Sequence, residues 1–251
     1  MIRLGVSLLL FIWSGVVITQ DDFADTMLQA NNAYQNSDYS TSIALYEELV
    51  DSGIRDANVY FNLGNAYYEN GQLGSALLNY RRAQQINPRD VDIGVNIALV
   101  RSERLDLQQG GANWLNAVAM TTRSSFTLSE LSWTVFFLWL LFFGLVVAWI
   151  IRANLRKRLR WLLVIGAACL LMGLAFLTSR MYVIQNRPGA VVTASSTQVM
   201  SGPGDEYLPL FSIFSAAEIR ILELHEDWMR FTLPDGRQGW ININTIELIG
   251  R

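Results

Sequence analysis

The side chains that could carry out acid–base, nucleophilic or metal chemistry are few in this chain, and they are isolated. Its single histidine, His225, stands beside Glu226 and Asp227, and its single cysteine is Cys169. A catalytic triad needs a nucleophile held against the histidine, and the sequence contains no Gly-x-Ser-x-Gly elbow. It also lacks a Cys/His metal spacing and a phosphate-binding loop. We therefore expect no enzyme activity, no catalytic residue, no metal site and no cofactor.

Amides and aromatic rings, which recognise rather than react, recur in the N-terminal part of the chain. Asparagine amides hydrogen-bond a peptide backbone in either direction, and tyrosine rings give contact area at a small entropic cost. Repeat spacing predicts a peptide-binding groove formed by Asn31, Tyr34, Asn62, Asn65 and Tyr68. The alternative for each residue is that it is solvated or packed against a neighbour.

A second set of aromatic side chains lies near the C-terminus. Tyr207, Trp228 and Trp240 are predicted to line a groove for a peptide or a glycan. The alternative is that the two tryptophans are buried in the core of a small domain.

A 34-residue repeat positions the first set of residues. Residues 57–90 carry small, aromatic and turn residues at the tetratricopeptide spacing, namely Tyr60, Leu63, Gly64, Tyr67, Gly71, Ala76, Tyr80, Ala83 and Pro88. Small residues such as Gly64 are expected where two helices cross, with Tyr80 filling the gap between them. A weaker copy covers 23–56, and a third copy holds one helix at about 91–106, predicted to be a solvating cap. The spacing thus predicts an all-α solenoid of five helices, with the groove along the first helix of each repeat.

Two uncharged segments follow the repeats. Residues 131–151 and 161–179 contain no charged side chain, and each exceeds the roughly 18 apolar residues that indicate a membrane span. We predict transmembrane helices at 128–152 and 161–179, joined by a basic loop at 153–160 into an antiparallel hairpin.

The ends of the first span carry interpretable polar residues. Thr127 and Glu130 are spaced as a capping box, which predicts that the helix begins there.

Five positive charges lie between the spans, at Arg152, Arg156, Lys157, Arg158 and Arg160. The positive-inside rule places this loop in the cytoplasm. Residues 1–20 carry Arg3 before an apolar run, which is typical of a signal peptide or signal anchor and predicts the same orientation. Both soluble domains are then expected on the extracytoplasmic side.

The C-terminal residues 188–251 predict a small all-β domain. Short β runs are expected at 190–194, 218–224, 228–233, 238–243 and 246–249. Ser201-Gly202-Pro203-Gly204 reads as a loop and Pro234-Asp235-Gly236 as a hairpin turn. Five strands in about sixty residues predict a small barrel. With Trp228 and Gly239-Trp240, the segment resembles a bacterial SH3 domain.

Charge excludes one class of partner. Residues 21–110 carry 13 acidic side chains and 6 arginines, and residues 188–251 carry 8 acidic side chains and 4 arginines. Nucleic-acid binding requires a basic face, so we expect no nucleic-acid partner. Residues 107–127 are predicted to be a linker between the repeats and the first span.

The order of these parts resembles a known family. The chain is similar in two respects to the BatE family of bacterial aerotolerance-operon proteins. The first is its order of parts: a signal segment, helical repeats, a two-span hairpin and a terminal SH3-like domain. The second is the pair of segments Tyr60-Phe61-Asn62-Leu63-Gly64-Asn65-Ala66-Tyr67-Tyr68 and Asn87-Pro88-Arg89-Asp90. The resemblance implies a multi-pass protein of the bacterial inner membrane. It also implies partners among von Willebrand A-type membrane proteins and a MoxR-type ATPase.

Two functions remain open at this point. The first is a membrane-anchored extracytoplasmic scaffold for protein–protein interaction, within an aerotolerance-type membrane complex. The second is a cell-wall sensor or regulator whose SH3-like domain binds peptidoglycan.

Overall fold

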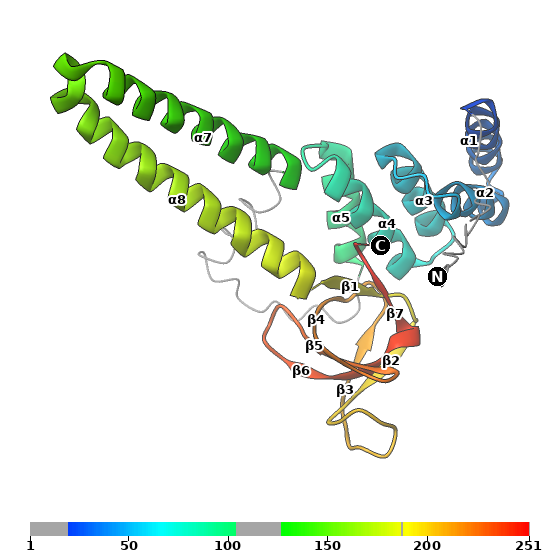
Figure 1. Ribbon diagram of the computed structural model, residues 1–251. Helices are drawn as coiled ribbons and strands as arrows, with labels where there is room; N and C mark the ends of the chain where they lie inside the picture. The colour runs from blue at the N-terminus through cyan, green and yellow to red at the C-terminus, as the bar shows by residue number, and fades with distance from the viewer. Residues whose placement is uncertain (1–19, 104–126, 187, 251) are drawn as a thin grey trace, which may run out of the picture.

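The computed structural model describes residues 20–103, 127–186 and 188–250 of the chain. They form a helical array, a long helical hairpin and a curved sheet (Figure 1). The described residues include only Gln20 of the predicted signal segment and only Thr127 of the predicted linker. The rest of both segments lies outside them.

The N-terminal array consists of five helices in two and a half helix pairs: α1 (Gln20–Gln35), α2 (Tyr39–Asp51), α3 (Ala57–Glu69), α4 (Leu73–Ile86) and α5 (Val91–Ser102). Aspartates begin three of them, because the carboxylates of Asp38, Asp56 and Asp90 accept hydrogen bonds from backbone N–H groups of the first turn. Gly71 ends α3 in the left-handed region, with φ of 74°.

The crossing of α3 and α4 explains the small residue of the repeat. A Cβ atom on Gly64 would lie 2.6 Å from a ring carbon of Tyr80, so only glycine allows this ring to fill the space between the helices. Tyr80 is 1% exposed. The predicted roles of Gly64 and Tyr80 are therefore confirmed.

The last helix of the array departs from the expected solvating cap. Ile93, Ile97 and Val100 of α5 are buried in the core shared with α4. The opposite face, however, exposes three further apolar side chains: Val91 (75%), Val95 (57%) and Leu99 (41%). The helix is thus apolar on both faces, and the prediction of a solvating outer surface was wrong.

The hairpin consists of α7 (Leu128–Ile151) and α8 (Arg156–Asn186), joined by the short 3₁₀ turn η1 (Ala153–Leu155). The capping box is confirmed, because the Thr127 hydroxyl accepts from the Glu130 N–H at 3.1 Å and the Glu130 carboxylate accepts from the Thr127 N–H at 2.9 Å. Both helices are long and apolar enough to cross a membrane by length and composition.

The predicted loop at 153–160 is mostly helix, since α8 already begins at Arg156. The reason is local: the Arg156 guanidinium donates to the carbonyl oxygens of Trp149 and Ile150, both at 3.2 Å. This side chain satisfies carbonyl groups that the end of α7 leaves unpaired. The connection thereby shortens to one tight turn.

Glycines allow close contact between α7 and α8. A Cβ on Gly166 would lie 3.3 Å from the Phe142 ring, and one on Gly173 would lie 3.3 Å from Val135. Small residues at these positions fit the expected helix–helix approach. The start of α7 and the end of α8 both lie at the end of the hairpin nearest the repeats and the sheet (Figure 1).

The C-terminal sheet contains seven antiparallel strands: β1 (Gly189–Val192), β2 (Ser196–Met200), β3 (Pro209–Phe214), β4 (Glu218–His225), β5 (Trp228–Thr232), β6 (Gln238–Asn242) and β7 (Ile246–Leu248). Their order is β3-β2-β6-β5-β4-β1-β7. The edge strands β3 and β7 do not pair, so the predicted closure into a barrel was wrong. The hairpin turn at 234–236 is confirmed, with Gly236 at φ of 91°.

Strands β2 and β3 were not predicted. Their side chains do not alternate regularly between buried and exposed, and a register shift between Val199 and Met200 interrupts their pairing. A β-bulge of this kind breaks the two-residue period by which a strand is recognised in sequence. The core beneath the sheet is formed by alternate residues of the strands, including Met229, Phe231 and Ile241.

Candidate functional site

The repeats and the sheet share one hydrophobic core. Val191 of β1 and Ala216, between β3 and β4, belong to the buried cluster formed by α3, α4 and α5. Gly74 of α4 makes this approach possible, because a Cβ there would lie 2.4 Å from the carbonyl oxygen of Val192 and 2.8 Å from the Thr193 Cα. The surface of α4 therefore rests directly on the backbone of the sheet domain.

A buried ion cluster joins the same two modules. The Glu218 carboxylate, at the start of β4, accepts from the Arg81 Nε of α4 at 2.6 Å and from the Arg101 Nε of α5 at 2.9 Å. The Glu218 side chain is 16% exposed. Burial by itself would raise the pKa of Glu218, but the two guanidinium groups outweigh it and hold that pKa below its usual value. These three residues, 137 and 117 positions apart, were not found from the sequence, which carries no local signal for their pairing.

In the concave face of the repeats, the predicted groove residue Asn31 is already engaged by neighbours. Its side-chain oxygen accepts from the Tyr46 hydroxyl at 2.6 Å and from the Asn62 amide at 3.4 Å. Three successive helices, α1, α2 and α3, are connected by this one amide oxygen.

The second repeat builds the same arrangement one period later. The Asn65 oxygen accepts from the Tyr80 hydroxyl at 2.8 Å and from the Asn96 amide at 2.9 Å. We call these six residues, in two sets of three, the asparagine–tyrosine ladder. Tyr46 and Asn96 were missed in the sequence, although each member stands 34 residues from its equivalent, which was the available signal.

Through these hydrogen bonds, Asn31, Asn62 and Asn65 help to hold the repeats together. This agrees with the alternative that each residue packs against a neighbour. Among the residues that the structure describes, the side-chain nitrogens of Asn31 and Asn65 make no hydrogen bond. Each amide therefore keeps its two donors for a ligand while its oxygen holds the repeats together.

The two predicted tyrosines lie one turn further along the same helices. Tyr34 is half-buried and meets the Tyr39 ring edge-on, with centroids 5.6 Å apart. Tyr68 is half-buried, and its hydroxyl donates to the Glu103 carboxylate. This hydrogen bond, more than burial, raises the pKa of Tyr68. The structure thus brings equivalent asparagine–tyrosine pairs together on α1 and α3.

The exposed apolar face of α5 continues this surface. Leu99 stands one repeat after Asn65, and Ser102 stands one repeat after Tyr68. This face is therefore polar and aromatic along α1 and α3, and along α5 it carries the exposed Leu99 beside the polar Asn96 and Ser102.

Removing a single hydroxyl from the ladder is expected to lower stability. Tyr80→Phe leaves the Asn65 oxygen with one partner instead of two, and a typical hydrogen bond contributes about 1 kcal/mol. We expect denaturant unfolding, followed by circular dichroism of the detergent-solubilised protein, to show a loss of about 1 kcal/mol. Tyr60→Phe is the control, since the buried Tyr60 makes no side-chain hydrogen bond within the described residues. Equal losses in both variants would contradict a structural role for the ladder.

The predicted C-terminal aromatic residues do not lie in the core. Trp240 is the cross-strand partner of Arg230, and Trp228 lies two residues before Arg230 on the same face of β5. Met229 and Phe231, which alternate with them, face the core. Both tryptophans are half-buried on the outer face of the sheet, and the interpretation that they are core residues was wrong.

Tyr207 and His225 complete the description of the predicted C-terminal residues. Tyr207 is 44% exposed in the loop between β2 and β3, where its ring covers Gly202. His225 is exposed, with its ring centroid 6.3 Å from that of Trp240. Within the described ranges, no group of three His, Cys, Asp or Glu side chains is placed to hold a metal.

This helical array, with its 34-residue period and its small residue at the crossing of α3 and α4, defines a tetratricopeptide-type α-solenoid. Comparison with protein families agrees, because residues 27–91 match the family described as Tetratricopeptide repeat. The chain therefore contains tetratricopeptide repeats. No curated protein sequence matches the chain at a significant level.

Proposed function

We propose that this chain is a membrane-anchored scaffold that binds a polypeptide along the concave face of its repeats. The observation that carries the proposal is the repetition of an amide donor and a tyrosine ring on α1 and α3, at Asn31 with Tyr34 and at Asn65 with Tyr68. A bound extended segment presents carbonyl oxygens at regular spacing, and these oxygens accept hydrogen bonds from such donors. The apolar stripe on α5 extends the contact surface.

The anchor in this proposal is the α7–α8 hairpin, which spans a bacterial inner membrane. The basic residues from Arg152 to Arg160 lie at the closed end of the hairpin, and the positive-inside rule assigns that end to the cytoplasm. The repeats and the sheet at the other end are then extracytoplasmic. The proposal includes no catalytic role.

The finer identity of the partners follows only from the resemblance to the BatE family. In that form of the proposal, the scaffold works in an aerotolerance-type membrane complex with von Willebrand A-type membrane proteins and a MoxR-type ATPase.

A second candidate function is supported by the outer face of the sheet. Trp228 and Trp240 are diagonal neighbours there, with Arg230 opposite Trp240. Half-buried tryptophans on the outer face of an SH3-like sheet favour binding of a peptidoglycan stem peptide or glycan. This alternative is a cell-wall sensor.

The groove proposal predicts that loss of the two tyrosine rings reduces partner capture. With Tyr34→Ala and Tyr68→Ala together, we expect the polypeptides crosslinked to the full-length protein in native membranes to fall at least fivefold. The control is Ile86→Ala, which removes an exposed apolar side chain (43%) at the end of α4. An unchanged crosslinked set would contradict the groove. Capture of purified sacculi, lost on Trp240→Ala, would instead favour the cell-wall sensor.

A further inference from the structure

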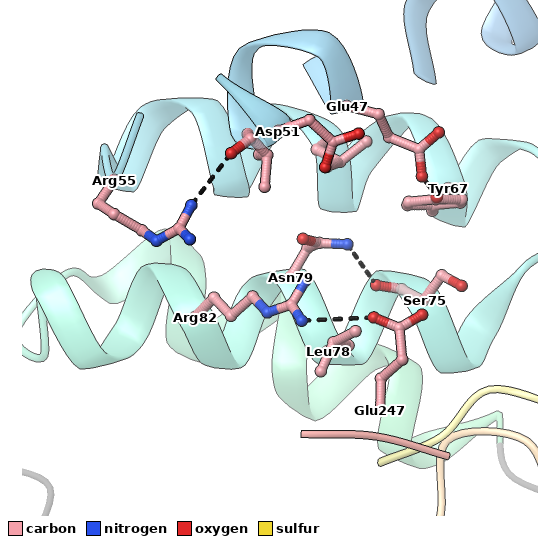
Figure 2. A pocket seen from close by; sticks show the side chains of 11 residues that line it. Glu47, Asp51, Arg55, Tyr67, Ser75, Leu78, Asn79, Arg82 and Glu247 are labelled. Carbon is pink, nitrogen blue, oxygen red and sulfur yellow. Dashed lines mark hydrogen bonds and ion pairs between the residues drawn. The ribbon is translucent and has the colours of Figure 1, made fainter. Parts of the chain in front are cut away.

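A cavity lies among the repeat helices and the last strand of the sheet, away from the predicted groove residues. It has a volume of about 290 Å³, is partly open to solvent and is lined by residues of α2, α3, α4 and β7 and by Arg55 (Figure 2). Glu247 of β7 provides part of its lining, so the docked sheet domain completes the cavity. None of the predicted groove residues lines it.

Two buried polar atoms in the cavity wall lack partners. Asn79 is 2% exposed, and its amide nitrogen donates to the Ser75 carbonyl oxygen at 2.9 Å. Its side-chain oxygen and the Nε of Arg82 make no hydrogen bond within the described part of the chain. Burying a polar atom unpaired costs about 1–3 kcal/mol, so an unpaired acceptor and an unpaired donor in one cavity wall indicate a ligand that supplies both.

Contacts of the neighbouring groups hold the Arg82 side chain in place. Its Nη2 donates to the Glu247 carboxylate at 3.3 Å and to the Leu248 carbonyl oxygen at 3.2 Å. The guanidinium is thus directed by β7, while its Nε stays unpaired in the cavity wall. The site has one fixed donor, at Arg82, and one fixed acceptor, at Asn79.

Carboxylates dominate the charge around the cavity. Glu47, Asp51 and Glu247 line it, together with two arginines, Arg55 and Arg82. The Tyr67 hydroxyl donates to the Glu47 carboxylate, and burial followed by this hydrogen bond raises the pKa of Tyr67. Tyr67 therefore stays neutral, and the three carboxylates outnumber the two guanidinium groups, which leaves a net negative charge on the cavity lining.

We infer that this cavity is a second binding site, for a lysine-containing extended peptide. The N–H and the carbonyl group of one ligand residue, which face the same side of an extended chain, donate to the Asn79 oxygen and accept from the Arg82 Nε. The lysine ammonium then lies among the carboxylates of Glu47 and Asp51. The cavity far exceeds the roughly 10–15 Å³ that one water molecule needs, so there is room for such a group.

The test uses the full-length protein in lipid nanodiscs and isothermal titration calorimetry. The probe is acetyl-Gly-Lys-Gly-amide, and the matched probe acetyl-Gly-norleucine-Gly-amide lacks only the ammonium group. We expect saturable binding of the lysine peptide and at least fivefold weaker binding of the norleucine peptide. Asn79→Leu, of similar volume, should weaken lysine-peptide binding at least tenfold, and Glu47→Gln at least threefold.

Two controls keep the result interpretable. Glu47 is exposed, so Glu47→Gln tests the site even if Asn79→Leu lowers the melting temperature. Glu223→Gln, which changes an exposed carboxylate of β4 outside the cavity, should leave binding unchanged. No saturable binding, as expected if water alone fills the cavity, or equal affinity in Asn79→Leu would overturn the inference.

Discussion

Replacing Gly74 by alanine is expected to separate the sheet domain from the repeats. The added methyl group would meet the Val192 carbonyl oxygen at 2.4 Å and the Thr193 Cα at 2.8 Å, both of them backbone atoms that cannot rotate away. Overpacking of this kind typically costs 1–3 kcal/mol or more. Alanine should at the same time stabilise α4 itself by about 1 kcal/mol relative to glycine. The variant should therefore keep helical repeats and lose the docked sheet.

Hydrogen exchange measures this effect at the level of single elements. We expect faster exchange of β1 amides and of the cavity-facing part of α4, with unchanged or slower exchange in the rest of the array. Gly94→Ala is the matched control, since Gly94 also lies within a helix, α5, and a Cβ there would meet no atom within 4 Å. That variant should gain about 0.5–1 kcal/mol. If the β1 amides are equally protected from exchange in both variants, the close approach at Gly74 does not determine whether the sheet docks on the repeats.

Replacing Glu218 by alanine is expected to have the second large effect, because it leaves Arg81 and Arg101 facing a buried site without their shared carboxylate. Breaking a buried ion pair by removing one partner costs about 3–5 kcal/mol. The partly exposed Arg101, with 45% of its side chain accessible, can turn toward water, so we expect about 3 kcal/mol. Denaturant unfolding followed by tryptophan fluorescence measures the loss. Glu223→Gln, whose carboxylate is 57% exposed and 3.9 Å from Arg230, should cost less than about 0.5 kcal/mol.

The same carboxylate makes docking dependent on pH. Burial raises the pKa of Glu218, the two arginines lower it more, and the folded pKa therefore lies below the unfolded value of about 4.3. The stabilisation by Glu218 is fully present above the unfolded pKa and is lost as the pH falls through the folded pKa. Glu218→Gln should remove this part of the acid dependence, and an identical acid profile in both proteins would contradict the assignment.

Much of the architecture was predictable because it follows from local patterns. The helix pairs of the repeats follow a 34-residue period, and Gly64 and Tyr80 occupy the positions that two crossing helices require. The capping box at Thr127 and Glu130 and the turn at Gly236 depend only on residues a few positions apart. In each case the interacting groups lie within one turn or one repeat, so their spacing in the sequence carries the information.

The candidate sites were only partly predictable. Sequence spacing placed Asn31, Asn65, Tyr34 and Tyr68 on equivalent faces, but it did not reveal that the asparagine oxygens are used within the fold. The barrel was predicted from strand count, whereas closure depends on whether β3 meets β7. Strand pairing across the sheet is a property of register and twist, which no single strand encodes.

The sequence by itself determined the tetratricopeptide repeats, two apolar helices and a set of β-strands, because period and composition follow the local geometry of the chain. Only the tertiary structure decided that α4 rests on the sheet at Gly74 and that Glu218 lies between two arginines. It also decided that Asn79 and Arg82 leave buried polar atoms unpaired in the wall of one cavity. The physical reason is that these features arise from burial and desolvation of groups far apart in the chain, and their energies exist only once the modules have met.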